Sequence, residues 1–217
     1  MTAGDRISSL YEALLARYGD PHWWPARTPY EVVVGAVLTQ NTAWGNVEKA
    51  IARFGDELSP EQVLRLDLAE LSEIIRPAGF FNQKAPYLKA VTEWFARYDF
   101  DVPTVRRQPL EKLRAELLST RGVGRETADS ILLYACGLPS FVVDAYTMRL
   151  CARYPIDAGE GYEAVKRFFE GNLARSAQLY NTFHALIVVH AKAHCRKKPL
   201  YDGCPLSDVC VRHGIDS

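Results

Sequence analysis

A short turn with two glycines, near the middle of the chain, restricts the possible folds more than any other feature. Apolar residues recur at helical spacing over Leu110–Leu118 and again over Ala128–Ala135, which predicts two one-faced helices. Between them lies Gly122-Val123-Gly124, and glycines let the chain reverse sharply and leave backbone N–H groups uncovered. The second helix would point its N-terminus and positive dipole end at the same place. The turn therefore predicts a phosphate site; the alternative is an ordinary helical hairpin.

An aspartate ends an apolar run shortly after this hairpin. Asp144 follows Phe141-Val142-Val143 and comes twenty residues after Gly124. A carboxylate at this place could meet the sugar beside a bound phosphate. Its alternative role is the N-cap of a helix that begins at Ala145, because aspartate is a good capping residue. The two roles can coexist.

The motifs around these residues resemble a known family. The pattern Leu-x-x-x-Gly-Val-Gly-x-x-Thr-Ala-Asp over 118–129, followed by Val-Val-Asp at 142–144, is similar to the helix-hairpin-helix, Gly/Pro/Asp superfamily of DNA glycosylases, in its endonuclease III branch. The resemblance extends over essentially the whole chain. It implies an all-α enzyme that removes damaged bases from DNA, in which Asp144 stabilises the positive sugar that forms as the base leaves.

One position departs from the bifunctional members of that family. They carry a lysine two residues after the second glycine, where this chain has Glu126. The lysine attacks the sugar, and a carboxylate cannot form the Schiff base that results. The resemblance therefore implies a monofunctional glycosylase that leaves an abasic site and does not cut the strand.

The resemblance also implies two helical domains that flank a DNA-binding cleft. Residues 28–137 would form a six-helix barrel with the helix-hairpin-helix, and residues 1–27 would pack with residues 138–217 as a discontinuous second domain. One segment gives conflicting signals, because Val32-Val33-Val34 favours a strand by propensity, whereas the family places a buried helix there. We expect the helix, since nothing else in the chain supplies strands to pair with it.

Several stretches are most similar to the 3-methyladenine DNA glycosylase III group, namely 23–25, 35–42 and 76–85. Members of this group are monofunctional, excise alkylated purines and share Glu126. Aromatic walls suit an electron-poor alkylated base through stacking and cation–π attraction. The residues implied at the base pocket are Trp24, Pro25, Trp44 and Lys192.

Two segments are expected to contact DNA. In the family a polar loop enters the duplex and fills the gap that the flipped nucleotide leaves. Gln40 and Asn41 suit this role, since their amides can hydrogen-bond the orphaned base; the alternative is a polar turn between helices. The hairpin residues expected at the DNA backbone are Gly122, Val123, Gly124, Arg125 and Thr127.

Three late cysteines predict a metal site. Cys195, Cys204 and Cys210 lie where endonuclease III relatives carry four cysteines around a [4Fe–4S] cluster. The spacing of the last two matches, but Tyr201 stands where another cysteine would precede Cys204. Three thiolates are one short of the usual set, so a cluster would need a ligand of another kind, and zinc or loss of the metal are the alternatives. The candidates for the fourth ligand are Tyr201, Asp202, His194 and His213.

Composition bears on the number of domains, the cellular compartment and the class of partner. The 217 residues suffice for one large or two small domains, and 48% are hydrophobic. Neither a membrane-spanning run nor a signal peptide is recognisable, and five cysteines without an export signal indicate a reducing compartment. We expect a cytoplasmic protein of the prokaryotic type. Basic and acidic residues number 26 each, which counts mildly against a nucleic-acid binder.

We therefore expect a monomer that acts on double-stranded DNA with a damaged base, associated with the nucleoid. Two other functions stay open. One is an endonuclease III-like glycosylase for oxidised pyrimidines or uracil, with or without lyase activity. The other is a DNA-binding module that keeps the hairpin without chemistry, although Asp144 stands where catalysis needs it.

Overall fold

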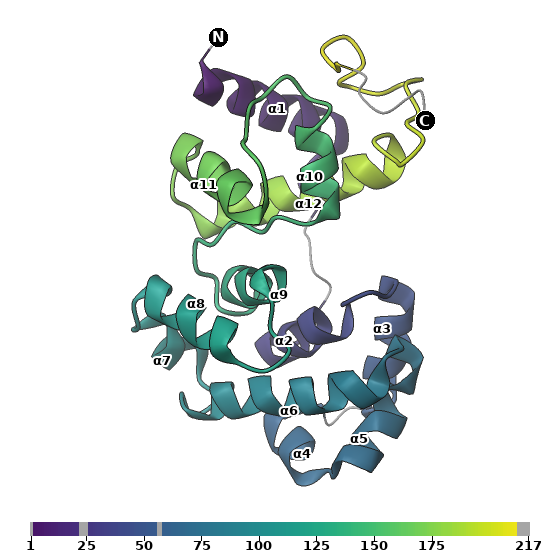
Figure 1. Ribbon diagram of the computed structural model, residues 1–217, viewed down its shortest axis with the longest axis vertical. Helices are drawn as coiled ribbons and strands as arrows, with labels where there is room; N and C mark the ends of the chain where they lie inside the picture. The colour runs from purple at the N-terminus through teal and green to yellow at the C-terminus, as the bar shows by residue number, and fades with distance from the viewer. Residues whose placement is uncertain (1, 22–25, 56–57, 212–217) are drawn as a thin grey trace. The chain divides into compact units, whose positions relative to one another are not determined.

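The computed structural model describes residues 2–21, 26–55 and 58–211, and the regular secondary structure in that part of the chain consists of helices (Figure 1). No β-strand occurs among the described residues, which confirms the predicted all-α fold. The chain divides into two compact units, Met1–Trp23 with Pro139–Ser217, and Trp24–Leu138. The units divide between Trp23 and Trp24 and between Leu138 and Pro139.

The unit Trp24–Leu138 contains most of the helices. Its elements are α2 (Pro29–Leu38), α3 (Trp44–Ala52), α4 (Pro60–Arg65), α5 (Leu68–Ile75), the 3₁₀-helix η2 (Arg76–Ala78), α6 (Phe81–Ala96), α7 (Val102–Arg106), α8 (Leu110–Ser119), α9 (Arg125–Ser130) and the π-helix η3 (Ile131–Ala135). The second unit contains α1 (Ala3–Tyr18), α10 (Ala145–Cys151), α11 (Tyr162–Asn172) and α12 (Ala177–Ala193).

Helix α2 resolves the conflict between propensity and fold. Thr28 caps it through a hydrogen bond from the backbone N–H of Glu31, and Pro29 occupies its first turn, which are the signals of a helix start. Eight of its ten residues are buried, and it contacts α3, α6, α9 and η3. A helix with apolar residues on all its faces is typically buried on all of them. The three valines therefore indicate a helix in the centre of the core and not a strand.

The unit with both chain termini has an aromatic core. The ring of Phe141 stacks on that of Phe169 at 4.3 Å between centroids, and it meets Tyr180 and Phe183 edge to face. All four side chains are buried, and each Phe contributes about 1.5–3 kcal/mol from burial alone. Phe141 belongs to the segment just before α10, so this core anchors the chain immediately upstream of Asp144.

The predicted hairpin is present, but its two glycines do different things. Gly122 has a positive φ of 80°, and a Cβ there would lie 2.0 Å from Cγ of Tyr87 on α6. Gly124 has extended backbone at φ −87° and caps α9, and a Cβ there would meet nothing within 4 Å. Only the first glycine is needed for the turn. The second leaves the N-terminus of α9 uncovered.

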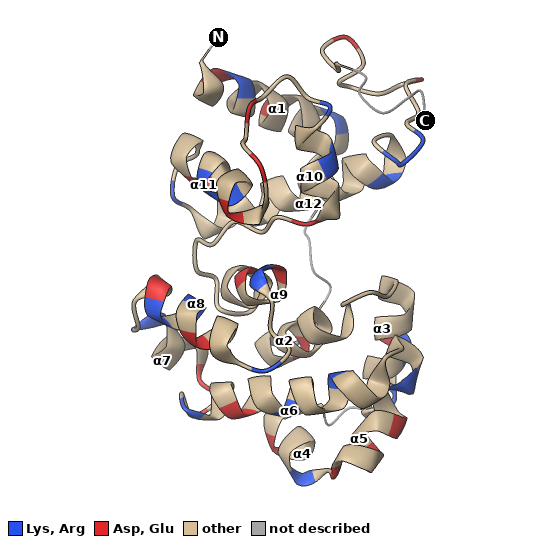
Figure 2. Cartoon of the chain, in the orientation of Figure 1, with Lys and Arg blue, Asp and Glu red and all other residues tan. Residues whose placement is uncertain are grey.

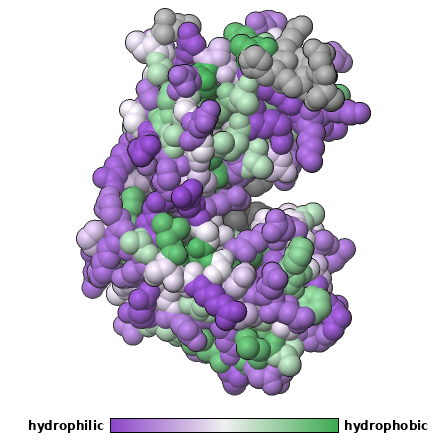
Figure 3. Space-filling view, viewed as in Figure 1, coloured by the Kyte–Doolittle hydropathy of each residue, from purple (hydrophilic) through white to green (hydrophobic). Residues whose placement is uncertain are grey.

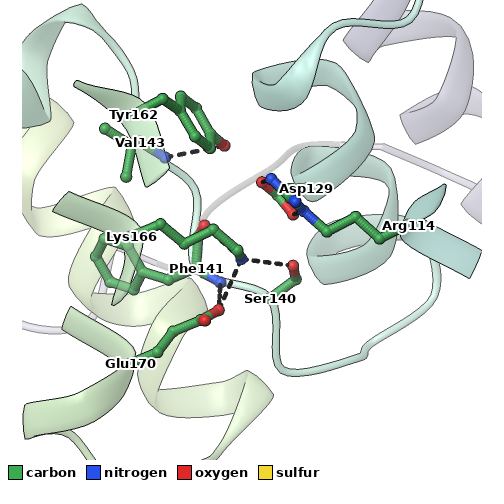
Figure 4. Close-up of polar contacts among 8 residues, drawn as sticks. All are labelled: Arg114, Asp129, Ser140, Phe141, Val143, Tyr162, Lys166 and Glu170. Carbon is green, nitrogen blue, oxygen red and sulfur yellow. Dashed lines mark hydrogen bonds and ion pairs between the residues drawn. The ribbon is translucent and has the colours of Figure 1, made fainter. Parts of the chain in front are cut away.

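A partly buried ion pair joins the two helices of the hairpin. Arg114 on α8 donates from Nε to Oδ1 of Asp129 at 2.9 Å and from Nη2 to Oδ2 at 3.1 Å (Figure 4). The Asp129 side chain is fully buried, and removal of one partner from such a pair costs about 3–5 kcal/mol. The pair therefore fixes α9 against α8.

We expect Gly122→Ala to lower the free energy of unfolding by at least about 2 kcal/mol, because alanine would adopt a left-handed backbone and collide with Tyr87. Gly124→Ala is the matched control and should change it by less than about 0.5 kcal/mol. Urea denaturation followed by tryptophan fluorescence measures both. Equal losses for the two variants would contradict the different roles of the two glycines.

Candidate functional site

Asp144 lies at the N-terminus of α10 and caps it. Its Oδ1 accepts hydrogen bonds from the backbone N of Thr147 at 2.7 Å and from Oγ1 of the same residue at 3.0 Å. The capping role considered from the sequence is therefore real. It occupies one carboxylate oxygen and leaves Oδ2 pointing elsewhere, so capping and chemistry are compatible.

His184 on α12 faces the second oxygen of that carboxylate. Its Nε2 lies 3.5 Å from Oδ2 of Asp144, at the outer limit of a hydrogen bond, so its influence is mainly electrostatic. Both side chains are largely buried, with exposed fractions of 7% and 12%. Sequence reasoning missed His184, because it occurs within an apolar helical stripe and looks like an ordinary core histidine.

Asp144 is kept ionised in spite of its burial. Burial alone would raise the pKa of this carboxyl, but the charge and hydrogen bonding of His184 and the two hydrogen bonds from Thr147 together lower it below its ordinary value. The carboxylate therefore carries its charge at neutral pH in a place from which water is mostly excluded. Such a fixed negative charge can stabilise a cation that develops next to it.

In the other unit, the loop after α2 is tied to the hairpin. Nε2 of Gln40 donates to the carbonyl of Gly122 at 3.0 Å and to Oγ1 of Thr127 at 3.0 Å. Asn41 follows in a left-handed conformation with φ 53° and an exposed side chain. Of the two amides predicted to enter DNA, one braces the protein in this structure and the other points to solvent.

The hairpin residues predicted at DNA differ in exposure. Gly124 and Arg125 are exposed and Gly122 is half-buried, whereas the side chains of Val123 and Thr127 are buried. Only the backbone of these last two residues can reach a phosphate. Glu126 is exposed in the first turn of α9, a position that the helix dipole favours for an acidic side chain.

A buried lysine holds the start of the loop that follows α2. Nζ of Lys84 donates to the carbonyl of Leu38, the last residue of α2, at 2.9 Å and to that of Ala78 at 2.8 Å. Burial lowers the pKa of Lys84 to about 8. The ammonium joins the end of α2 to the turn before α6, and Phe80 in that turn lies 6.0 Å from it.

Phe80 is a second residue that sequence reasoning missed. It has φ 48°, and its side chain is 60% exposed, the highest value among the described large hydrophobic residues. The face seen in Figure 3 is largely hydrophilic with separate apolar patches. An exposed aromatic side chain in a strained backbone conformation is typical of functional positions. The signal in the sequence was Gly79-Phe80-Phe81, in which only one ring can face the core.

The predicted base-pocket residues are only partly described. Trp24 and Pro25 lie outside the described residues. Trp44 begins α3 in one unit and donates from Nε1 to Oε1 of Glu48 at 2.9 Å. Lys192 is exposed on the last turn of α12 in the other unit. Basic residues continue beyond it through 196–198, and the end of α12 and the following loop are blue in Figure 2.

The three late cysteines lie around one pocket. Cys195 is buried, and its Sγ accepts a hydrogen bond from Nη1 of Arg153 at 3.4 Å. Burial raises the pKa of the Cys204 thiol, and the nearby Cys210 and Cys195 add to the rise. Arg153 also donates to the carbonyls of Arg196 and Lys197. The residues that line the pocket include Arg153, His190, His194, Cys195, Tyr201, Cys204 and Cys210.

This donor set does not match a four-thiolate cluster site. It supplies three thiols, and over residues 2–21, 26–55 and 58–211 no three His, Cys, Asp or Glu side chains are arranged to hold a metal ion. His213 lies outside the described residues, and Asp202 is exposed. Within those same ranges, no helix is both long and apolar enough to cross a membrane.

Sequence comparisons agree on one family. A profile of the HhH-GPD superfamily of base excision DNA repair proteins matches residues 34–175. MJ1434 of Methanocaldococcus jannaschii, which carries the name of a DNA repair glycosylase, is 48% identical and covers 95% of this chain and 96% of its own length. Endonuclease III of Escherichia coli is 27% identical over 84% of this chain and 83% of its own.

Solved structures show the same fold. The 3-methyladenine DNA glycosylase MagIII of Helicobacter pylori, bound to 1,N6-ethenoadenine, has a TM-score of 0.71 and 28% identity, and covers 89% of this chain and 98% of its own. An endonuclease III–DNA complex has a TM-score of 0.81 and 23% identity, with 99% and 97% covered. The ionised Asp144, the glycine hairpin and these matches lead to one conclusion: the chain belongs to the HhH-GPD superfamily and is a base excision repair DNA glycosylase.

Proposed function

We propose that the protein is a monofunctional glycosylase that hydrolyses the N-glycosidic bond of alkylated purines of the 3-methyladenine type in duplex DNA. The observation that carries the proposal is Asp144, a buried carboxylate that His184 and Thr147 keep ionised. Glu126 supports the monofunctional part, since the residue after Arg125 offers no amine for covalent catalysis.

The chemistry needs one well-placed charge. Alkylation makes the purine a cationic leaving group, so the bond from the purine to C1′ breaks with both electrons leaving on the base. The sugar becomes an oxocarbenium-like cation, and the Asp144 carboxylate stabilises it. Water then adds to C1′ and loses a proton, and an abasic site remains. Loss of such electrostatic stabilisation costs about 10²–10³-fold in rate.

The base pocket is proposed from the family resemblance. Trp24, Pro25 and Trp44 would stack on the extruded base, with Lys192 close to the site. An aromatic wall attracts a cationic base by the face of its ring. The MagIII structure, whose protein is named for 3-methyladenine and holds 1,N6-ethenoadenine, supports a purine pocket in this branch.

We further propose that Asn41 and Phe80 enter the duplex while Gln40 keeps the loop in place. Asn41 and Phe80 are exposed, whereas both hydrogen bonds of the Gln40 amide go to the hairpin. The exposed N-terminus of α9, with Gly124 and Arg125, would bind a backbone phosphate. Residues 28–137, and 1–27 with 138–217, would act as the two domains of a monomer in a prokaryotic-type cytoplasm.

A second candidate is the endonuclease III reaction on oxidised pyrimidines or uracil. Several relatives at 26–28% identity bear the name endonuclease III, which favours it. Glu126 disfavours the lyase version, in which a lysine must attack C1′. The two candidates therefore differ in substrate and in strand cleavage.

The test is base release from duplexes with methylated purines, each sample being split into alkali-treated and untreated halves. We expect strand breaks only after alkali. Asp144→Asn should lose at least about 10²-fold in base release and still bind DNA. Breaks without alkali would contradict the monofunctional proposal, and release of only oxidised pyrimidines or uracil would favour the second candidate.

The same assay has a predicted pH dependence. The pKa of Asp144 is lowered, so its charge is present above that pKa and is lost as the pH falls through it. Base release under single-turnover conditions should stay level at neutral pH and decline only below the ordinary aspartate range. A decline that begins near neutrality would indicate that another group controls the reaction.

Gln40 and Asn41 can be separated by substitution. Gln40→Ala should lower the free energy of unfolding by about 1 kcal/mol, because it removes two hydrogen bonds to the hairpin. Asn41→Gly tolerates the left-handed backbone, so stability should hold while base release from duplex DNA falls relative to single-stranded DNA. Loss of the duplex preference in Gln40→Ala alone would reverse the assignment.

A [4Fe–4S] cluster at Cys195, Cys204 and Cys210 remains a prediction from the resemblance. It would need a fourth ligand of another kind, and no step of the proposed reaction depends on it. Iron and acid-labile sulfide analysis of protein purified without oxygen tests it. Iron and sulfide bound in proportion to protein would support the cluster; zinc or no metal would contradict it.

A further inference from the structure

The segment that leads to Asp144 is a buried extended chain without a sheet. Ser140, Phe141, Val142 and Val143 are all buried, and they belong to no helix or strand. A buried backbone N–H or C=O that lacks a hydrogen bond is costly. In a sheet a neighbouring strand would supply the partners. Here the N–H and C=O of Phe141 and the N–H of Val143 find partners on side chains of a helix.

Helix α11 supplies these partners from a single stripe. Tyr162, Lys166 and Glu170 are spaced four residues apart, so they lie on one face of the helix. The backbone N of Phe141 donates to Oε1 of Glu170 at 2.8 Å, and Nζ of Lys166 donates to the Phe141 carbonyl at 3.2 Å. Figure 4 shows this side of α11 facing the extended segment.

Residues of the stripe also bind each other, and they bind both ends of segment 140–143. Lys166 is buried and donates to Oε1 of Glu170 at 2.7 Å and to Oγ of Ser140 at 2.8 Å. At the other end, the backbone N of Val143 donates to the hydroxyl of Tyr162 at 3.4 Å. Val143 is the residue directly before Asp144, so the last of these bonds is one peptide away from the carboxylate.

We propose that Tyr162, Lys166 and Glu170 are positioning residues that set the place of the Asp144 carboxylate, an inference that rests on the proposed function of Asp144. The stripe replaces a β-strand as the hydrogen-bonding edge for residues 140–143. Residues 140–143 are not paired with a neighbouring strand that would fix their position. The Lys166–Glu170 pair therefore sets the point along α11 at which the chain reaches Asp144 and α10 begins.

The position of Asp144 matters because its carboxylate must lie close to the sugar cation that it stabilises, and the backbone of residues 140–143 sets where this side chain begins. Asp144 must keep Oδ1 on Thr147 of α10 and Oδ2 towards His184 of α12, so a shift of residues 140–143 would displace the carboxylate relative to His184. A misplacement of about 1 Å at a reacting group can cost on the order of 10²-fold in rate. Slippage of the segment would also weaken the contacts that keep Asp144 ionised.

The variants separate positioning from folding. Lys166→Met removes the donor to Ser140 and Phe141, and Glu170→Gln keeps an oxygen for the Phe141 N–H while it removes the charge that attracts Lys166. Tyr162→Phe removes only the hydroxyl that accepts from the Val143 N–H. Arg167→Gln is the matched control, because Arg167 is exposed on the same helix.

Three quantities are measured on each variant that remains folded by circular dichroism. They are the Asp144 pKa by carboxyl-carbon NMR without DNA, the single-turnover rate of base release, and the dissociation constant for a duplex with an abasic-site analogue. We expect the Asp144 pKa to rise towards its ordinary value and the rate to fall, by about 10- to 100-fold in Lys166→Met and less in Tyr162→Phe. The dissociation constant should change little, and Arg167→Gln should match the wild type.

An unchanged Asp144 pKa and rate in folded Tyr162→Phe and Glu170→Gln would overturn the proposal, even if Lys166→Met failed to fold. If the wild type releases no base from any DNA, the proposed function fails instead. The NMR titration needs no substrate, so a raised Asp144 pKa in the variants would still support the positioning role.

Discussion

The chemistry proposed for this protein depends on a charge that is kept inside it. Burial acts against ionisation of Asp144, and the contacts from Thr147 and His184 more than offset it. The same carboxylate closes the first turn of α10. In the proposed mechanism, helix capping and catalysis therefore use the same side chain, so a change in the local structure at Asp144 also changes the electrostatics of the site.

The overall architecture followed from the sequence because it rests on periodic patterns and capping residues. The helical spacing from Leu110 to Ala135 predicts the hairpin, and Asp144 caps α10, one of the two roles expected for it. The valines of α2 needed the family resemblance, since propensity alone indicates a strand there. The apolar pattern of a segment indicates that it is buried, but the elements that pack against it are determined by the tertiary fold.

The details of the site were less accessible, because they depend on contacts between residues far apart in sequence. Nothing local distinguishes His184 from a core histidine, or Lys166 from a surface lysine. Gln40 is predicted at DNA from its amide alone, and its partners within the protein, Gly122 and Thr127, lie more than eighty residues away in the sequence. The cysteine segment was predicted by resemblance, whereas the role of Arg153 in holding its carbonyls was not visible.

The bridge from Gln40 to the hairpin has a consequence for sequence divergence. An amide at position 40 is useful there only while a hydroxyl stands at position 127 and the turn exposes the carbonyl of Gly122. A replacement at one of these sites removes a partner from another, so their effects on stability should be non-additive. Lineages that alter this loop would be expected to alter the hairpin with it, and substitutions at positions 40 and 127 should appear together.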